Sequence, residues 1–404
     1  MAVSVPTVPD ASGTVSVHSS ARSAATAAEW PIYAVLVASA SIVIGLIWDI
    51  SWHRTIGRDT FWSPPHLLQQ AGAIISGLSC GHLALSTTFA GTADARAKSV
   101  RFWKYFYAPL GAWVCIWGAL MMITSAPFDD WWHNAYGLDV KIISPPHMVL
   151  ASGMIAIQIG AMLMALAAQN RAGSESEKKR FGIVFIVSAA VIVLMAATMV
   201  LEDASLANEM HQSTFYQITA IAFPIFLVAF ARASRVSWPA TKIAAGYSVI
   251  LLLAIWILQL VPATPKLAPI YNAVTHMVPP PFPLLLVFPA IAIDLLLARF
   301  GSDRDWALSV VLGILFVGLM LGIHWYWAEF MISPAARNFF FAADQWDYTS
   351  RLGPWRYEFE LDVDAAGKWS PSLFAKGIGI AVVTAIVTSR IGLAWGKGLL
   401  KVRR

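Results

Sequence analysis

Long runs of apolar residues, separated by short polar connections, make up most of this 404-residue chain. A helix needs about 20 apolar residues to cross a bilayer, and runs of roughly that length recur ten times. They lie at 31–51, 65–90, 105–126, 146–169, 181–201, 213–231, 241–262, 281–299, 306–329 and 371–395. The pattern therefore predicts an all-α integral membrane protein with about ten transmembrane helices.

Composition and charge agree with this fold class and add an orientation. Only 13% of residues are charged and the mean hydropathy is +0.64, whereas about a quarter of the residues in a soluble domain are charged. Lys and Arg gather in the connections after spans two, four, six and eight and in the C-terminal tail. The positive-inside rule places these connections and both termini in the cytoplasm of a cell with the protein in its inner (plasma) membrane. The net charge of +5 thus reflects topology; the expected partner is the lipid bilayer, and no nucleic-acid partner is expected.

The chain divides into five predicted parts. The first is Ser/Thr/Ala-rich without the apolar core of a signal peptide, and is predicted to be a disordered tail. The fourth is an extracytoplasmic loop in which "RYEFELDVD" (356–364) alternates at period two and predicts a short strand. The parts are the tail 1–28, spans one to four in 29–170, spans five to nine in 171–329, the loop 330–370, and the last span with its basic tail in 371–404.

One polar motif occurs twice, each time between two predicted spans. "DISWHRTIGRDTFWSPPH" (49–66) and "DDWWHNAYGLDVKIISPPH" (129–147) share D-x-x-W-H-x-x-x-G-x-D followed by S-P-P-H. An Asp and a His four residues apart share one face of a helix. The glycine is expected to end that helix, and Ser-Pro-Pro is typical of a helix start, with the final His in the first turn. The predicted clusters are Asp49, His53 and His66 in the first copy and Asp129, His133 and His147 in the second.

A carboxylate with two imidazoles in a membrane protein predicts a metal site, because ionisable residues at membrane depth are usually functional. A proton relay or a structural hydrogen-bond network is the alternative. Asp59 and Asp139 are candidates to orient a ligand His through its second nitrogen, or else to cap the turn after the glycine. Glu202 and His211 are candidates for a third, degenerate site, or else satisfied polar residues.

The two clusters resemble the C subunit of the copper membrane monooxygenases, the particulate methane and ammonia monooxygenases. The family has an Asp, a His four residues later and a His thirteen after that, as in Asp49, His53 and His66. Its second cluster has Asn, then His at spacings of four and fourteen, and here Asp129 replaces that Asn. The resemblance covers residues 45–155 and rests on spacing. The family's C subunit is shorter, has fewer spans, and acts with two other subunits.

Two classes of function follow from these clusters. The first is a membrane oxidoreductase that resembles a monooxygenase: copper, as the resemblance implies, or else iron would act with dioxygen on a small hydrophobic substrate, and zinc is a further alternative for the bound metal. Electrons would come from a quinol or another electron donor, with partner membrane subunits. The second class is a copper or zinc capture or transport protein, with a non-catalytic subunit of a membrane oxidoreductase complex as a further alternative. The inner halves of the spans are nearly bare of further ligands, which favours the enzyme over transport.

Overall fold

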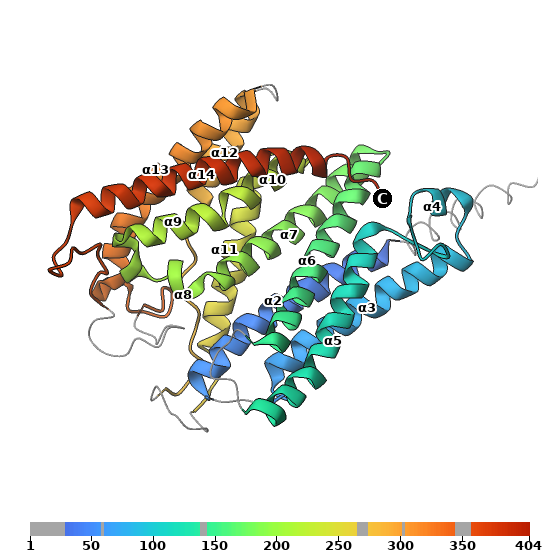
Figure 1. The fold of residues 1–404 in the computed structure, drawn as a ribbon, viewed down its shortest axis with the longest axis horizontal. Helices are drawn as coiled ribbons and strands as arrows, with labels where there is room; N and C mark the ends of the chain where they lie inside the picture. Colours follow the sequence, from blue (N-terminus) through green and yellow to red (C-terminus); the bar gives the residue numbers. More distant parts are fainter. Residues whose placement is uncertain (1–28, 58–59, 138–143, 265–273, 301–303, 344–356) are drawn as a thin grey trace, which may run out of the picture.

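The computed structural model describes residues 29–57, 60–137, 144–264, 274–300, 304–343 and 357–404. The predicted tail, residues 1–28, lies outside this part of the chain. Nearly all described elements are helices, packed side by side in one bundle (Figure 1). The long helices are α2 (Trp30–Thr55), α3 (Pro64–Phe89), α5 (Leu110–Tyr136), α6 (Pro145–Arg171), α7 (Glu175–Met199), α9 (Ser213–Ala222), α10 (Pro224–Ala233), α11 (Pro239–Leu258), α12 (Val287–Arg299), α13 (Asp305–Ile332) and α14 (Pro371–Leu399). The short ones are α4 (Ala93–Ala97), α8 (Leu201–Ala204) and the 3-10 helices η1 (Ala207–His211) and η3 (Pro334–Ala336).

Eight helices in the described residues are long and apolar enough to cross a membrane, counting α9 and α10 as one. The all-α, multi-pass character predicted from the sequence is therefore confirmed. The other two predicted spans correspond to α3 and α12. Helix α3 has 26 residues but carries Gln69, Gln70 and two histidines, and α12 has only 13 residues. The count of ten and the position of both termini remain predictions.

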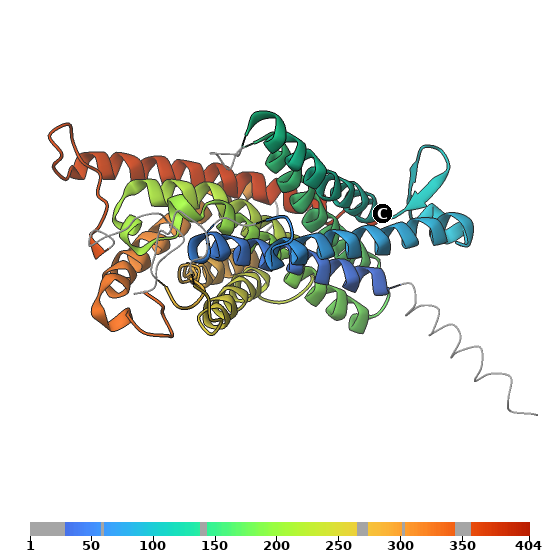
Figure 2. The same ribbon diagram turned by 90° about the horizontal axis from the view of Figure 1, so that it is seen from below.

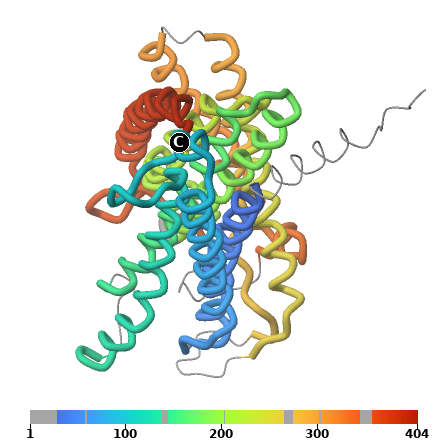
Figure 3. Tube along the Cα trace, turned by 90° about the vertical axis from the view of Figure 1, so that its right-hand side faces the viewer, coloured from blue at the N-terminus to red at the C-terminus, as the bar shows by residue number. Residues whose placement is uncertain are grey.

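The centre of the bundle is formed by α7, which is surrounded by α2, α6, α10 and α11. In the membrane-length segment of α7, 83% of the residues are buried, which is the largest share among the eight helices. Large side chains such as Phe185, Tyr216, Phe230 and Tyr247 fill the space around it. Helix α14 lies along α10 and α13 on one side, as Figures 1 and 2 show. The two motif-bearing hairpins, α2–α3 and α5–α6, lie on the other side (Figure 3).

Glycines bring the helices of the α5–α6 hairpin into close contact. A Cβ atom at Gly153 would lie 2.7 Å from the carbonyl oxygen of Gly118, and a Cβ at Gly118 would lie 2.8 Å from that of Gly153. In α2–α3, a Cβ at Gly72 would lie 2.8 Å from the carbonyl oxygen of Ala38. Small residues allow membrane helices to approach so closely that backbone packs on backbone. These contacts set the positions of the motif residues at the hairpin ends.

The chain before α12 is extended although it is buried. Proline lacks an N–H group, so the "VPPPFP" run cannot form a regular helix, and α12 begins only at Val287. Backbone N–H groups of this segment bond to side chains from three helices: Val278 to Thr55 Oγ1 (2.8 Å), Leu284 to Tyr247 Oη (3.1 Å) and Leu285 to His324 Nε2 (3.1 Å). Non-helical backbone at membrane depth requires such partners. The predicted helical span at 281–299 is thus only partly helical.

Two further expectations differ from the structure. The span predicted from residue 105 begins at Leu110, because β1 (Val100–Phe102) and β2 (Phe106–Ala108) form an antiparallel hairpin before it. The strand predicted at 356–364 is reduced, in the described residues from 357 on, to a single bridge between Val363 and Trp369. Among the described residues no further strand lies beside this bridge, and so short a pairing does not form a sheet by itself.

Candidate functional site

The helices carry both motif copies to the positions expected from the sequence. Helix α2 continues through Asp49 and His53 as far as Thr55, and α5 continues through Asp129 and His133 as far as Tyr136. Gly57 and Gly137 follow with φ of +99° and +87°. This left-handed region suits glycine and ends the helix. The predicted helix breaks are confirmed.

The second helix of each hairpin also begins as predicted. Helix α3 begins at Pro64 and α6 at Pro145, so that His66 and His147 lie in the first turn. Ser144 caps its helix by accepting a hydrogen bond from the His147 N–H (3.4 Å), while Ser63 lies at the same position without a side-chain cap bond. Each first-turn His therefore points toward the end of the preceding helix.

In the first copy, Asp49 and His66 meet across the α2–α3 hairpin. Oδ1 of Asp49 lies 3.2 Å from Nε2 of His66, and the two side chains are 15% and 28% exposed. Nδ1 of His66 lies 3.2 Å from the carbonyl oxygen of Thr60. A carbonyl only accepts, so Nδ1 carries the proton of this bond, and a neutral imidazole then presents a lone pair at Nε2. A cation between the carboxylate oxygen and this lone pair, either a proton or a metal ion, would stabilise their approach to 3.2 Å.

The second copy repeats this chemistry with a different histidine. Oδ2 of Asp129 lies 3.3 Å from Nε2 of His133, and Nδ1 of His133 lies 3.3 Å from the carbonyl oxygen of Gly137. On its other side, Oδ1 of Asp129 lies 3.8 Å from Nε2 of His147 across the α5–α6 hairpin. Asp129 therefore lies between the two imidazoles, in contact range of each.

Both carboxylates also carry an oxygen whose hydrogen-bonding capacity is unused. Oδ1 of Asp49 and Oδ1 of Asp129 are fully buried and accept no hydrogen bond from the described residues. These oxygens lie 3.2 Å from His66 Nε2 and 3.8 Å from His147 Nε2, but neither approach is aligned as a hydrogen bond. Leaving a buried carboxylate oxygen without a donor is costly. A bound cation would remove that cost.

The distances between donor atoms allow a direct test of fit to a metal. Nitrogen and oxygen ligands about 2.0–2.2 Å from one tetrahedral ion lie about 3.3–3.6 Å from each other. The Asp49–His66 and Asp129–His133 pairs, at 3.2 and 3.3 Å, agree with this spacing, and Asp129–His147 at 3.8 Å is slightly wider. However, no group of three or more His, Cys, Asp or Glu side chains in the described residues is arranged to hold a metal ion. The structure shows carboxylate–imidazole pairs that fit two ligands of a metal, and no completed ligand set among those residues.

The remaining candidate residues are placed less closely. His53 is exposed on α2, and the ion pair recorded for Asp49 in the described residues is with His66. Asp59 and Asp139 lie outside the described residues, as does the side chain of Glu202. His211 is buried between the rings of Trp325 and Phe359, with centroid distances of 3.9 and 3.6 Å, and its Nε2 lies 3.0 Å from the Trp325 carbonyl oxygen. These partners of His211 are aromatic rings and a backbone carbonyl.

Sequence reasoning missed the carbonyls of Thr60 and Gly137, which orient one imidazole in each copy. The signal available in the sequence was weak, because any residue supplies a carbonyl. A metal-binding His usually donates its other N–H to a carbonyl or carboxylate. Only the structure reveals that this role falls to Thr60 and Gly137.

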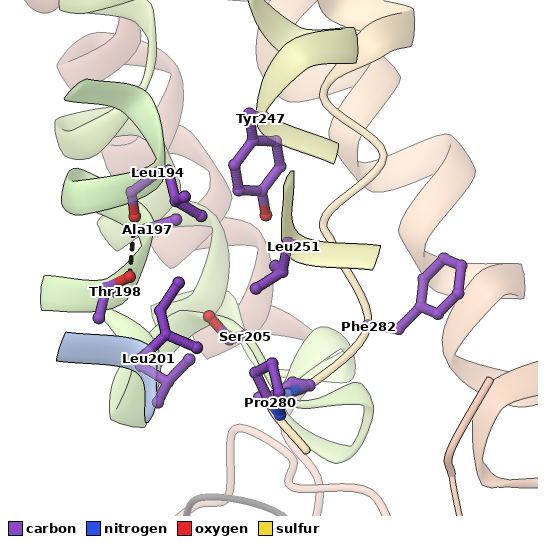
Figure 4. Close-up of a pocket in the computed structure, with 11 residues that line it drawn as sticks. Leu194, Ala197, Thr198, Leu201, Ser205, Tyr247, Leu251, Pro280 and Phe282 are labelled. Atoms are coloured by element: carbon purple, nitrogen blue, oxygen red, sulfur yellow. Dashed lines mark hydrogen bonds between the residues drawn. The ribbon is translucent and has the colours of Figure 1, made fainter. Parts of the chain in front are cut away.

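A narrow cavity lies on the side of α2 that carries Ile47 (Figure 4). It is bounded by Tyr247 and Leu251 of α11, by Ser205, and by Pro280 of the extended segment, and it has room for about one water molecule. The adjoining wider cavity shares Ser205 and Pro280 with it and is lined by Trp327 and other aromatic side chains. These cavities border the extended segment and not the Asp–His pairs.

Comparisons with protein-family models, curated proteins and solved structures find no match to this chain.

Proposed function

We propose that the protein is a membrane metalloprotein that binds a transition metal at its two Asp–His clusters. The observation that carries this proposal is the arrangement found twice: one imidazole nitrogen lies within 3.2–3.3 Å of a turn carbonyl, and the other lies 3.2–3.3 Å from an oxygen of the motif carboxylate. A bound cation would stabilise this arrangement, and its spacing suits two ligands of one ion.

We propose that a second histidine completes the ligand set at each cluster. At the second cluster it is His147, whose side chain is 36% exposed and therefore has room to rotate toward Asp129. At the first cluster it is His53, which is exposed four residues after Asp49 on α2. Metal binding would draw these imidazoles onto the existing pairs.

Copper is the metal that we propose, since it accepts imidazole ligands and the spacing resembles that of the copper membrane monooxygenases. The activity that we propose is a copper-dependent oxidoreductase acting with dioxygen on a small hydrophobic molecule. Bound copper would supply the redox chemistry. The protein's own residues would hold the ion near the membrane surface, where His66, His133 and His147 are each a quarter to a third exposed.

A second candidate is favoured by the lack of a completed three-residue set in the described part of the chain. In this alternative each pair carries a second proton in place of a metal, and Asp49–His66 and Asp129–His133 are proton-exchanging groups. The two candidates make opposite predictions about metal content.

Metal analysis of the purified full-length protein after copper loading separates them. We expect about two equivalents in the wild type, and about one in His133→Ala and in Asp49→Asn, because the two ligands left at an altered site hold an ion poorly. Asp130→Asn is the matched control, since Asp130 is the exposed neighbour of Asp129 and interacts with Asn134 instead. Its copper content should equal that of the wild type.

A chelator titration tests whether Asp129 is a metal ligand. Replacing the anionic ligand by a neutral amide in Asp129→Asn should release copper from the second site at lower chelator concentration, while the first site keeps its copper. Copper content unchanged in both Asp49→Asn and His133→Ala would refute the metal proposal and leave the proton pairs.

A further inference from the structure

The hairpin formed by β1 and β2 projects beyond the ends of α3 and α5, which it connects (Figure 2). Phe102 pairs with Phe106, so the turn consists of residues 103–105. Helix α5 is long and apolar enough to cross a membrane, and the 26-residue α3 packs against it. A projection beyond the ends of both helices would therefore lie at a membrane surface.

The backbone of the turn is unusual for the residues it contains. Trp103 and Lys104 have φ of +47° and +67°. Left-handed backbone is a genuine outlier for a bulky side chain, and Gly or Asn would adopt it with less strain. The turn conformation therefore does not explain the choice of Trp and Lys at these positions. Strain of this kind concentrates where side chains have a function.

The base of the hairpin is fixed to the bundle. The Trp113 indole N–H donates to the Val100 carbonyl (3.2 Å), and the Tyr107 N–H donates to Thr88 Oγ1 (2.8 Å). The ring of Phe102 lies 5.0 Å from that of Trp113. These contacts hold the hairpin rigidly between α3 and α5, so that its tip is presented at a fixed height.

The tip exposes aromatic and basic side chains together. Trp103 is 70% exposed and Tyr105 is 75% exposed. Arg101 and Lys104 are exposed beside them, and the Arg101 guanidinium lies 5.8 Å from the Tyr107 ring centroid. The connection 90–109 contains four Lys or Arg and a single acid, which is paired with Lys98. The tip cations therefore have no acidic partner among the described residues of this connection.

We propose that this hairpin docks into the headgroup layer of the membrane and binds an anionic phospholipid. Trp and Tyr prefer the boundary between headgroups and acyl chains, and basic residues close to a membrane surface are attracted to anionic lipid. Trp103 and Tyr105 lie at that boundary, and Arg101 and Lys104 bind the lipid phosphate. The hairpin thereby anchors the connection between α3 and α5 to one leaflet.

Native mass spectrometry of the full-length protein, titrated with phosphatidylglycerol or phosphatidylcholine, tests this assignment. Each basic residue near an anionic surface contributes about a fivefold preference. The double variant Arg101→Gln/Lys104→Gln should therefore need on the order of twentyfold more phosphatidylglycerol for half-saturation of the tightest site, with phosphatidylcholine binding unchanged. Lys178→Gln/Lys179→Gln is the matched control, because it removes two charges from the first turns of α7, outside the hairpin. It should leave the tightest site unaltered.

A separate measurement tests the aromatic half of the proposal. In vesicles containing phosphatidylglycerol, lipids brominated near the headgroup should quench a larger share of the tryptophan fluorescence in the wild type than in Trp103→Phe. Three outcomes would overturn the proposal: an unchanged phosphatidylglycerol titration in the double variant, equal quenching in Trp103→Phe, or displacement of the bound lipid by inorganic phosphate. The last would indicate a site for free anions.

Discussion

A close backbone contact between α5 and α6 gives a stability prediction with a defined magnitude. In Gly153→Ala, the new methyl group would lie 2.7 Å from the Gly118 carbonyl oxygen and 2.8 Å from Met122 Cγ. Ordinary van der Waals contact begins near 3.4 Å, so α5 and α6 must separate by about 0.7 Å at this level. Overpacking of this kind costs about 1–3 kcal/mol.

The helix propensity of alanine partly hides that cost, because replacing a helical glycine by alanine gains about 1 kcal/mol. Gly81→Ala isolates the propensity effect, since a Cβ at Gly81, in the helix α3, meets no atom within 4 Å. We therefore expect Gly81→Ala to be neutral or stabilising, and Gly153→Ala to be less stable than Gly81→Ala by about 1–3 kcal/mol.

The free energy of unfolding of both variants can be measured in mixed micelles by titration with a denaturing detergent, followed by circular dichroism. Separation of α5 from α6 should also draw Asp129 away from His147, so that copper at the second site becomes easier to remove with a chelator. If Gly153→Ala is as stable as Gly81→Ala, the two helices are not in backbone contact, and the described geometry of the second cluster is wrong.

Three other predictions rest on particular contacts. Asp294 accepts hydrogen bonds from the Ala240 and Thr241 N–H groups at the start of α11, so Asp294→Ala should lower the unfolding free energy by about 1–2 kcal/mol, measured as above. His324→Phe should cost about 1–3 kcal/mol because it leaves the Leu285 N–H without an acceptor, and His324→Gln should cost less. A cysteine introduced at Ala135, which is exposed beside the second motif, should react with an impermeant thiol reagent from outside the cell; reaction only from the cytoplasmic side would reverse the predicted orientation.

Local patterns predicted the motif hairpins well, because each feature depends on residues within a few positions. Gly57 and Gly137 end helices, Pro64 and Pro145 begin them, and all four positions agree with the structure. The spacing of four residues between Asp49 and His53 did not determine the nearest partner, however. The α2–α3 turn brings His66 to Asp49 instead, and the path of that turn depends on packing that no local pattern encodes.

The span before α12 shows where hydropathy fails. An apolar run rich in proline has the same hydropathy as a helix, but its backbone cannot form the helical hydrogen bonds. The replacement partners Thr55, Tyr247 and His324 come from α2, α11 and α13, so the sequence gives no local sign of them. Asp294 illustrates the same limit, since it caps α11 from a different helix.

The extended segment before α12 has a consequence for the order in which the chain inserts into the membrane. A helix of 13 residues is about 20 Å long, too short to cross the hydrocarbon layer by itself. In the segment that completes the crossing, the side chains that accept from backbone N–H groups are those of Thr55 and Tyr247, which are synthesised earlier, and of His324, which is synthesised later. We therefore expect α12 to enter the bilayer only together with α13, against α2 and α11 that have already inserted.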